Sequence, residues 1–204
     1  MERRFTSNSP IKIEDRSEGE PLIVGYASVF YDGSPGTEYN LYDDFVERIA
    51  PGAFTRALQE QQDVRGLFNH DANLILGRTV AKTLSLSVDN RGLRYEIIPP
   101  ETSVATNLVT SIRRGDVSGS SFSFRVARQT WTEIGDLVIR LVEDVDLYDV
   151  GPVTFPAYKG ADSGVRAWGD GAEARAAFEQ WRSTQKRGRR MDVKARARAI
   201  QVRV

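Results

Sequence analysis

The clearest pattern in the sequence is an alternation of apolar and polar side chains with a period of two residues. Phe122 and Phe124 alternate with Ser121 and Ser123. A period of two places successive side chains on opposite faces of a β-strand, so one face packs into a core and the other carries hydroxyl groups. Because Ser120 falls in step with Phe122, we expect it on the apolar face, apart from the other two serines.

Similar patterns predict the remaining elements. A run rich in β-forming and small residues predicts a strand over residues 22–30, and a second strand is expected over residues 45–49. Alternation predicts a hairpin over residues 84–97, and residues 131–145 are expected to form a ribbon that turns at Gly135-Asp136. Apolar residues three and four apart predict helices over residues 51–61, 103–114 and 172–185, the second of them capped at Thr102 or Ser103 and ended by Gly115. This sum of antiparallel strands with a few helices predicts a mainly β, α+β fold.

The two ends of the chain differ from its middle. Residues 1–20 are polar and charged, which predicts a loosely held N-terminal arm that pairs with the rest of the fold late. Residues 21–168 carry nearly all of the predicted strands and are expected to form one domain. Residues 169–204 are expected to contain a helix and a basic tail, in which residues 186–204 show no clear periodic pattern.

Length and composition suit one soluble domain with appendages. The chain has 204 residues and an apolar fraction of 40%, which is ordinary for a globular protein. It has no cysteine, which excludes disulfides and thiolate metal sites and agrees with a reducing compartment. No apolar run approaches the roughly 18 residues of a membrane span, and no signal peptide begins the chain. We therefore expect a cytoplasmic protein that does not act at a membrane.

The net charge of zero conceals an asymmetry. From residue 182 to the end there are nine basic residues and one acid, which leaves 19 basic and 27 acidic residues, a charge of −8, in the preceding body. Such a tail is typical of a segment that binds nucleic acid, of one that docks on an acidic protein surface, and of a disordered, solvated chain end. Without interleaved aromatic residues or a nucleic-acid-binding motif, the sequence argues against a nucleic-acid partner.

The candidate chemistry begins with the serine-rich strand and the single histidine. A serine nucleophile needs a base within hydrogen-bond reach and a third group that orients the base. His70 is the one histidine of the chain, and it follows an apolar run at a predicted strand end. Each residue alone also fits a solvated surface position. Metal catalysis is disfavoured, because one histidine and scattered carboxylates make no recognisable ligand set, and no cofactor is expected.

Six short blocks, in this order, resemble the tailed-phage prohead (capsid maturation) serine protease family. They are GYASVF at residues 25–30, IAPGAF at 49–54, NHD at 69–71, LGRT at 76–79, GDVSGSSFSF at 115–124 and DVGPVTFPAY at 149–158. The resemblance covers about residues 20–166. It implies a closed antiparallel β-barrel surrounded by helices, as in the related herpesvirus assemblin proteases.

The resemblance also implies the function. It implies a serine endopeptidase in the bacterial host cytoplasm, inside the assembling procapsid, that cleaves scaffold protein or the scaffold-like segment of the major capsid protein precursor. Self-cleavage and a homodimer or higher homo-oligomer are further implications. The rival interpretations are a noncatalytic capsid-assembly or scaffold-binding module on the same fold, and a β-barrel domain that binds small ligands or nucleic acid.

The resemblance assigns the nucleophile to Ser121, the base to His70 and the acid to Asp149. The competitors for the acid are Asp146, Asp144 and Asp71, and a turn-capping role for Asp149 stays open. The sequence departs from the family at two places, where Ser120 replaces an apolar residue and Gly151-Pro152 replaces a serine and an aliphatic residue. Arg78 and Arg125 could contact substrate, but structural ion pairs are the simpler expectation.

Overall fold

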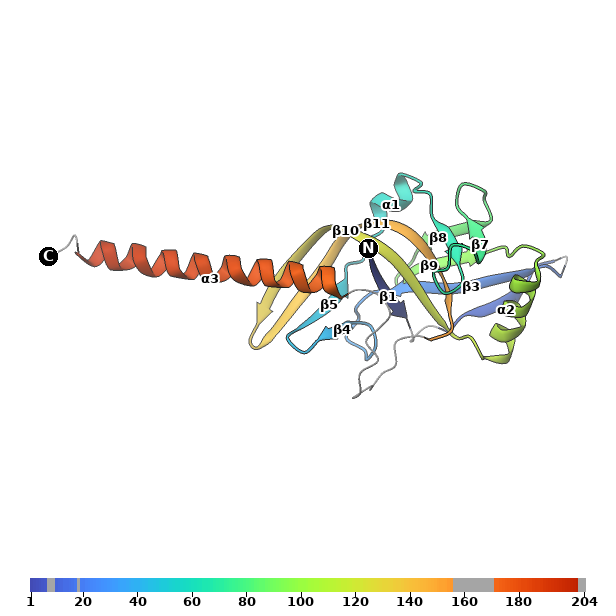
Figure 1. The fold of residues 1–204 in the computed structure, drawn as a ribbon, viewed down its shortest axis with the longest axis horizontal. Helices are drawn as coiled ribbons and strands as arrows, with labels where there is room; N and C mark the ends of the chain where they lie inside the picture. The colour runs from blue at the N-terminus through green and yellow to red at the C-terminus, as the bar shows by residue number, and fades with distance from the viewer. Residues whose placement is uncertain (7–9, 18, 156–170, 202–204) are drawn as a thin grey trace. The chain divides into compact units, whose positions relative to one another are not determined.

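The computed structural model describes residues 1–6, 10–17, 19–155 and 171–201. Backbone contacts divide the chain into two units, Met1–Gly169 and Asp170–Val204 (Figure 1). The expected domain boundary at residues 168 and 169, and residues 156–158 of the last family block, lie outside the described residues. All of the described strands belong to the first unit, so the candidate chemistry lies there.

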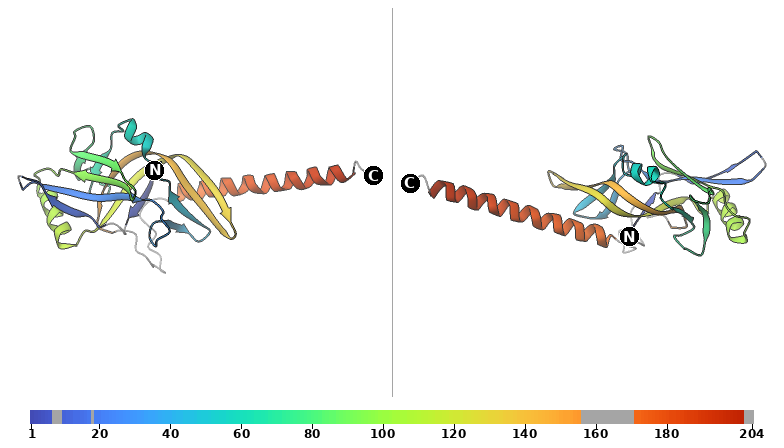
Figure 2. Two further views of the ribbon diagram at one scale, coloured as in Figure 1. Left: turned by 180° about the vertical axis from the view of Figure 1, so that it is seen from behind. Right: turned by 90° about the horizontal axis from the view of Figure 1, so that it is seen from above.

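The larger sheet has seven strands and is built around one long hairpin. Its main path runs β1 (Glu2–Thr6), β10 (Gly119–Ile134), β11 (Leu137–Val153), β5 (Phe45–Ile49) and β4 (Tyr39–Tyr42). Two short strands extend it from β11, namely β6 (Arg65–Leu67) and then β7 (Ile75–Arg78). The β10–β11 hairpin, coloured yellow to orange, bends through the first unit in both views of Figure 2.

The smaller sheet has four antiparallel strands. Its order is β2 (Lys12–Asp15), β3 (Pro21–Val29), β9 (Gly92–Ile97) and β8 (Leu84–Val88). The β8–β9 pair confirms the hairpin that alternation and the Asp-Asn-Arg-Gly turn predict. In that turn, Asp89 Oδ1 accepts hydrogen bonds from the backbone N–H groups of Arg91 and Gly92, at 2.8 and 3.1 Å, so the aspartate closes the turn.

The expectation of a closed antiparallel barrel is wrong, although the mainly β, α+β class is consistent with the structure. Among the described strands, β1 and β4 end the larger sheet and β2 and β8 end the smaller one, so neither sheet closes. The larger sheet is also mixed, because β11 pairs in parallel with both β5 and β6. Alternation identifies the face of each residue but not the partner of each strand, and closure depends on the partners.

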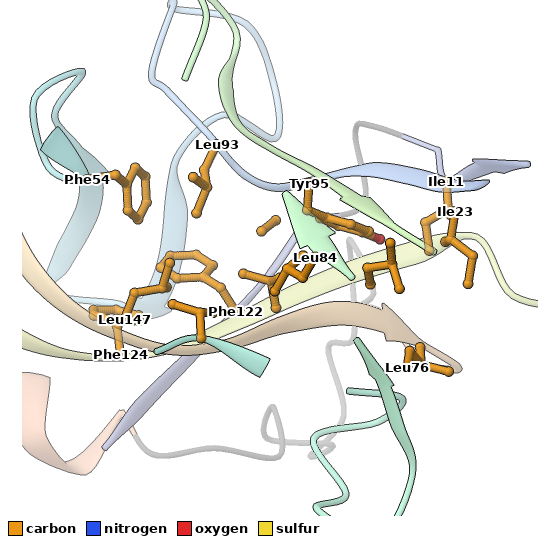
Figure 3. Close-up of a cluster of buried hydrophobic side chains, with 14 of the residues drawn as sticks. Ile11, Ile23, Phe54, Leu76, Leu84, Leu93, Tyr95, Phe122, Phe124 and Leu147 are labelled. Carbon is orange, nitrogen blue, oxygen red and sulfur yellow. The ribbon is translucent and has the colours of Figure 1, made fainter. Parts of the chain in front are cut away.

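The core fills the space between the two sheets. Phe122, Phe124 and Val150 come from the larger sheet, and Leu93 and Tyr95 come from the smaller one; all five are fully buried. Figure 3 shows several of these side chains converging from strands of both sheets. The aromatic rings of Phe122 and Phe124 stack with their centroids 4.7 Å apart. The core therefore fixes β10, whose opposite face carries Ser121 and Ser123.

Of the three predicted helices, the second begins and ends close to its predicted positions, the first is shorter than predicted and the third is longer. Helix α1 covers Thr55–Gln59 and α2 covers Ser103–Arg114, where Thr102 accepts a hydrogen bond from the backbone N–H of Ala105. Gly115 follows α2 with φ of 84°, a left-handed conformation that glycine adopts without strain. In the second unit, α3 (Ala172–Gln201) continues well beyond residue 185. No helix in the described ranges combines the length and the apolar content needed to cross a bilayer.

The polar N-terminal segment, which the sequence predicts as an arm, contributes two strands. Strand β1 pairs with β10, and β2 pairs with β3. Alternate side chains of β1, beginning with Glu2, are buried, and they include Arg4 and Thr6. Four charged groups explain this burial. Glu2 and Arg4 form ion pairs with Glu47 and Arg140, which compensates for the removal of these charges from water.

Candidate active site

The two faces of β10 separate its three serines as the alternation predicts. Ser120 lies on the core side, where its hydroxyl is 2.9 Å from the hydroxyl of Tyr95. Ser121 and Ser123 point to the other face, toward His70 and Asp149 respectively. Only Ser121 of the three contacts the histidine in the described structure, because Ser120 bonds within the core and Ser123 bonds to the acid.

His70 reaches the serine because β6 runs alongside β11. Strand β6 pairs in parallel with β11 at Asp149 and Val150, and the chain turns immediately after it. Asn69 fixes this turn to the end of β11, since its side chain bonds to the backbone N–H of Thr154 at 2.8 Å and its own N–H bonds to the carbonyl of Pro152 at 3.0 Å. Asn69 and His70 both have positive φ, of 56° and 58°, an arrangement that a non-glycine residue keeps only when its surroundings impose it.

Asp149 faces the site because of an irregularity in β11. Ser123 is paired with Asp149, but the next residue, Phe124, is paired with Leu147, so Tyr148 is an extra residue in β11. A bulge of this kind reverses the alternation of a strand. Leu147 therefore points into the core while Asp149, two residues later, points to the opposite face.

These placements bring the three residues into one chain of contacts. The Oγ of Ser121 lies 2.5 Å from Nε2 of His70, and Nδ1 of His70 lies 2.5 Å from Oδ1 of Asp149. The hydroxyl of Ser123 donates a hydrogen bond to the second oxygen of Asp149. The three groups come from β10, the loop after β6, and β11, which are neighbours in one sheet. Their positions are therefore fixed by strand pairing.

The competing acids have other partners. Asp71 accepts a hydrogen bond from the backbone N–H of Asn73 at 2.8 Å, which stabilises the turn after His70. Asp144 and Asp146 both accept hydrogen bonds from the guanidinium of Arg56, at 2.9 and 2.7 Å. The hydrogen bond and charge of Arg56 lower the pKa of the Asp146 carboxyl. Among the four acids that the sequence proposes, the geometry brings Asp149 alone to the histidine.

The two arginines that the sequence singles out lie elsewhere. Arg78 donates hydrogen bonds to both carboxylate oxygens of Asp63, at 2.7 and 2.6 Å, and its side chain is half exposed. This bidentate pair raises the pKa of Arg78 and agrees with the expected structural role. Arg125 is exposed on β10, where its charge helps to lower the pKa of Asp146. Neither contact involves Ser121 or His70.

Comparison with known proteins identifies the family of this chain. The profile described as caudovirus prohead serine protease matches residues 7–169. The chain belongs to this family. The prohead protease of Enterobacteria phage HK97 is 32% identical over 163 residues, which cover 78% of this chain and 66% of that protein. The chain thus spans about two thirds of that relative's length. No solved structure matches the chain closely enough to be informative.

Within this prohead protease fold, Gly151 is required by the approach of β6. Gly151 is paired with Ser121 across the β10–β11 hairpin and has φ of +155°. A Cβ atom at this position would lie 2.1 Å from the backbone oxygen of Leu67, a severe overlap. The absence of a side chain at Gly151 therefore lets β6 pack closely beside β11, one strand away from the serine.

The sequence gives no sign of the contacts that β1 makes with the site of this prohead protease family member. Ser121 donates a hydrogen bond to the backbone carbonyl of Arg4 at 2.9 Å. The ring of Phe5 stands edge-on to the imidazole of His70, with centroids 6.1 Å apart. A backbone carbonyl has no residue-specific signature, so no motif could predict the first contact. The alternation of side chains in a strand places Arg4 and Phe5 on opposite faces of β1, but it does not show which residues either one contacts.

The arrangement can carry out nucleophilic acyl transfer. A carboxylate that accepts the Nδ1 proton holds the histidine in the tautomer whose Nε2 can take a proton. Nε2 then faces the serine hydroxyl at the distance that proton transfer requires. The side chains of His70 and Asp149 are only 5% and 8% exposed, and Ser121 is 0% exposed, which strengthens electrostatic interactions within the group.

Proposed function

We propose that this chain is a serine endopeptidase that acts inside the assembling procapsid of a tailed phage, within the bacterial host. Its substrate would be scaffold protein or the scaffold-like segment of the major capsid protein precursor. Membership of the prohead serine protease family supports this proposal. The observation that carries it is the hydrogen-bonded series from Ser121 through His70 to Asp149.

In the proposed reaction, Ser121 is the nucleophile and His70 the general base. As Oγ attacks the carbonyl carbon of the scissile peptide, its proton moves to Nε2 of His70. The imidazolium that forms is stabilised by Asp149, which accepts the Nδ1 proton in a hydrogen bond. The hydroxyl of Ser123 donates to the other oxygen of Asp149, and this contact keeps the carboxylate oriented toward the ring.

The second half of the reaction returns the enzyme to its starting state. His70 gives its proton to the nitrogen of the leaving peptide, the C–N bond breaks, and an acyl group stays on Ser121. A water molecule then loses a proton to His70 and attacks the acyl carbon. The ester bond to Oγ of Ser121 breaks, which releases the new carboxyl end, and His70 returns its proton to Oγ. The same chemistry would let the protein trim its own basic tail, where Lys and Arg residues gather.

The test is incubation of the purified chain with the capsid protein precursor of the same phage, followed by mass spectrometry of the products. The expected result is a small number of defined cuts in the scaffold-like segment. The matched control is Ser121→Ala, which keeps the fold and removes the nucleophile. Cuts that persist in Ser121→Ala would be due to another protease and would contradict the proposal.

A noncatalytic assembly module is the second candidate function. The burial of Ser121 favours it, because a serine with no exposed surface does not meet substrate in this state. Labelling with a fluorophosphonate, which reacts with activated serines, distinguishes the two. Label on Ser121 supports the protease, whereas folded protein that never reacts under any condition supports the assembly module.

A further inference from the structure

Strand β1 lies where a peptide substrate would have to lie. It is the last strand of the larger sheet and pairs antiparallel with residues 120–124 of β10. Phe5 is directly opposite Ser121 in this register, and Arg3 is opposite Ser123. Because opposite residues in an antiparallel pair share a face, Arg3 and Phe5 extend toward the face that carries the catalytic groups. Extended peptides commonly bind proteins by adding a strand to such an edge.

The backbone of β1 also occupies the position of a scissile peptide. The carbonyl of Arg4 accepts a hydrogen bond from Ser121 Oγ at 2.9 Å, so the peptide unit between Arg4 and Phe5 is next to the nucleophile. The Phe5 ring stands edge-on to the imidazole of His70 at the same time. Together these contacts account for a nucleophile that is 0% exposed.

This contact also competes for the proton that catalysis needs. The hydroxyl of Ser121 has one proton and two acceptors, Nε2 of His70 at 2.5 Å and the carbonyl of Arg4 at 2.9 Å. A hydroxyl that donates to the carbonyl does not donate to the base. While β1 is in place, the nucleophile is therefore both covered and partly diverted from its base.

Two buried acidic and two buried basic side chains connect β1 to the rest of the sheet, and each side contributes one acid and one base. Glu2 and Arg4 belong to β1, whereas Glu47 and Arg140 belong to β5 and β11. Arg140 donates hydrogen bonds to Glu2 at 2.8 Å and to Glu47 at 2.6 Å. Departure of β1 removes one positive and one negative charge, and the pair between Glu47 and Arg140 stays intact. The rest of the sheet is thus left without an unpaired buried charge, a condition under which removal of β1 need not unfold it.

We propose that the edge of β10 over residues 120–124 is the substrate-binding strand, that substrates bind there as extended antiparallel segments, and that β1 is an intramolecular occupant of this site. The folded chain is then latent, and β1 must leave before a substrate can enter. This inference rests on the proposed function, because it concerns the substrate of the same serine.

The first experiment compares the full chain with a variant that lacks residues 2–6. The readouts are the rate of fluorophosphonate labelling at Ser121 and the thermal unfolding of each protein. Deletion is expected to raise the labelling rate at least about tenfold, because the competent fraction of the molecules increases. A synthetic peptide of residues 1–6, added in trans, is expected to slow labelling of the shortened protein and not of the full chain.

A second variant tests the proposal in the full chain, whether or not the shortened protein folds. Thr6 and Ser120 are directly opposite each other on β1 and β10, and the chain contains no cysteine. The double variant Thr6→Cys, Ser120→Cys therefore allows one disulfide, which would hold β1 in place. The expected result is slow labelling when it is oxidised and faster labelling after reduction. The matched control is Thr6→Ser, Ser120→Cys, whose labelling should not respond to reduction.

The outcomes separate this inference from the proposed function. If the full chain labels at Ser121 and neither deletion nor reduction of the disulfide changes the rate, the protease stands and the inference is overturned. If folded, shortened and reduced proteins all fail to react at Ser121, the proposed function and the inference both fail. Faster labelling on deletion or reduction, together with inhibition by the peptide, supports the inference.

Discussion

Nδ1 of His70 lies 2.5 Å from Oδ1 of Asp149, although 79 residues separate them in the sequence. The contact depends on β6, which pairs with β11 at Asp149 and delivers His70 three residues after its last residue, Leu67. The bulge at Tyr148 turns Asp149 toward the imidazole. The candidate triad is thus produced by one parallel strand pair and one irregularity in a neighbouring strand.

The first prediction is that Ser121→Ala and His70→Ala each abolish cleavage without unfolding the protein. Both residues act in one proton transfer, so each change should lower kcat/KM by about 10⁴-fold or more, and the double variant should lose little more. Peptide cleavage and thermal unfolding, measured on the same samples, test this expectation.

Ser123→Ala is the control for that prediction. The hydroxyl of Ser123 donates to Asp149 and does not contact His70, so its loss should lower kcat only about tenfold. Full activity in Ser121→Ala, together with loss of activity in Ser123→Ala, would transfer the nucleophile to Ser123.

The second prediction concerns the acid. Asp149→Asn should lower kcat by about 10⁴-fold and leave KM nearly unchanged, because an amide that donates to Nδ1 favours the wrong tautomer of His70. Asp146→Asn is the matched control, since Asp146 is three residues away on the same strand and is paired with Arg56. Equal and small effects of the two changes would mean that Ser121 and His70 work without an acid.

The third prediction tests the close packing of β6 against β11. Gly151→Ala should place a Cβ atom against the backbone oxygen of Leu67, displace β6, and withdraw His70 from Ser121. The fall in kcat should be larger than the decrease in the fraction of folded protein, as measured by thermal unfolding of the same variant. Gly135→Ala is the control, because Gly135 also has positive φ, 60°, but has no atom within 4 Å of the added Cβ. It should cost roughly 1–3 kcal/mol in stability and leave kcat unchanged.

The fourth prediction concerns the buried charges around β1. Burial alone would raise the pKa of the Glu2 carboxyl, but the hydrogen bond from Arg140 and the charges of Arg4 and Arg140 outweigh it and lower that pKa. A lowered folded-state pKa means that the unfolded chain binds its proton first as the pH falls. The stabilisation is therefore complete above the ordinary glutamate value of about 4.3 and is lost as the pH falls through the lowered value.

Two variants test this electrostatic contribution. Arg140→Met leaves Glu2 and Glu47 with Arg4 as their remaining cation, and it should lower the free energy of unfolding by about 3–5 kcal/mol. Glu2→Gln should make the free energy of unfolding depend less steeply on pH below about 4, as measured by urea denaturation at several pH values. Glu14→Gln, at an exposed carboxylate on β2, should leave that dependence unchanged.

Local patterns in the sequence predict local structure well. Alternation gives the β8–β9 hairpin and the division of Ser120 from Ser121 and Ser123, because each depends on residues close together in the chain. The boundaries of β5 also follow from its own residues. The resemblance supplies His70 and Asp149, which the geometry brings together. Strand pairing between distant segments is not encoded in alternation, so the open, mixed sheets and the position of β1 could not be predicted. The contact of the Arg4 carbonyl with Ser121 could not be predicted for the same reason, because it depends on the pairing of β1 with β10.

The last prediction concerns the basic tail. Residues 186–204 continue α3 as far as Gln201 and belong to the second unit, whereas the strands that carry the candidate site belong to the first. Deletion of these residues should therefore leave thermal stability and peptide cleavage nearly unchanged. Because its charge is opposite to that of the acidic body and of similarly acidic partners, the tail is suited to tether the enzyme to scaffold or capsid protein.

Deletion of residues 186–204 should accordingly reduce incorporation into procapsids, and the binding of the full chain to assembling shells should weaken as salt is added, because screening reduces attraction between exposed charges. The measurement is the amount of protease that sediments with procapsids at low and high ionic strength. A matched variant in which Lys186, Arg187 and Arg189 are changed to Gln keeps the length of the tail and isolates the contribution of charge. A shortened protein that fails to fold, or that enters procapsids as efficiently as the full chain, would show that the tail has a different role.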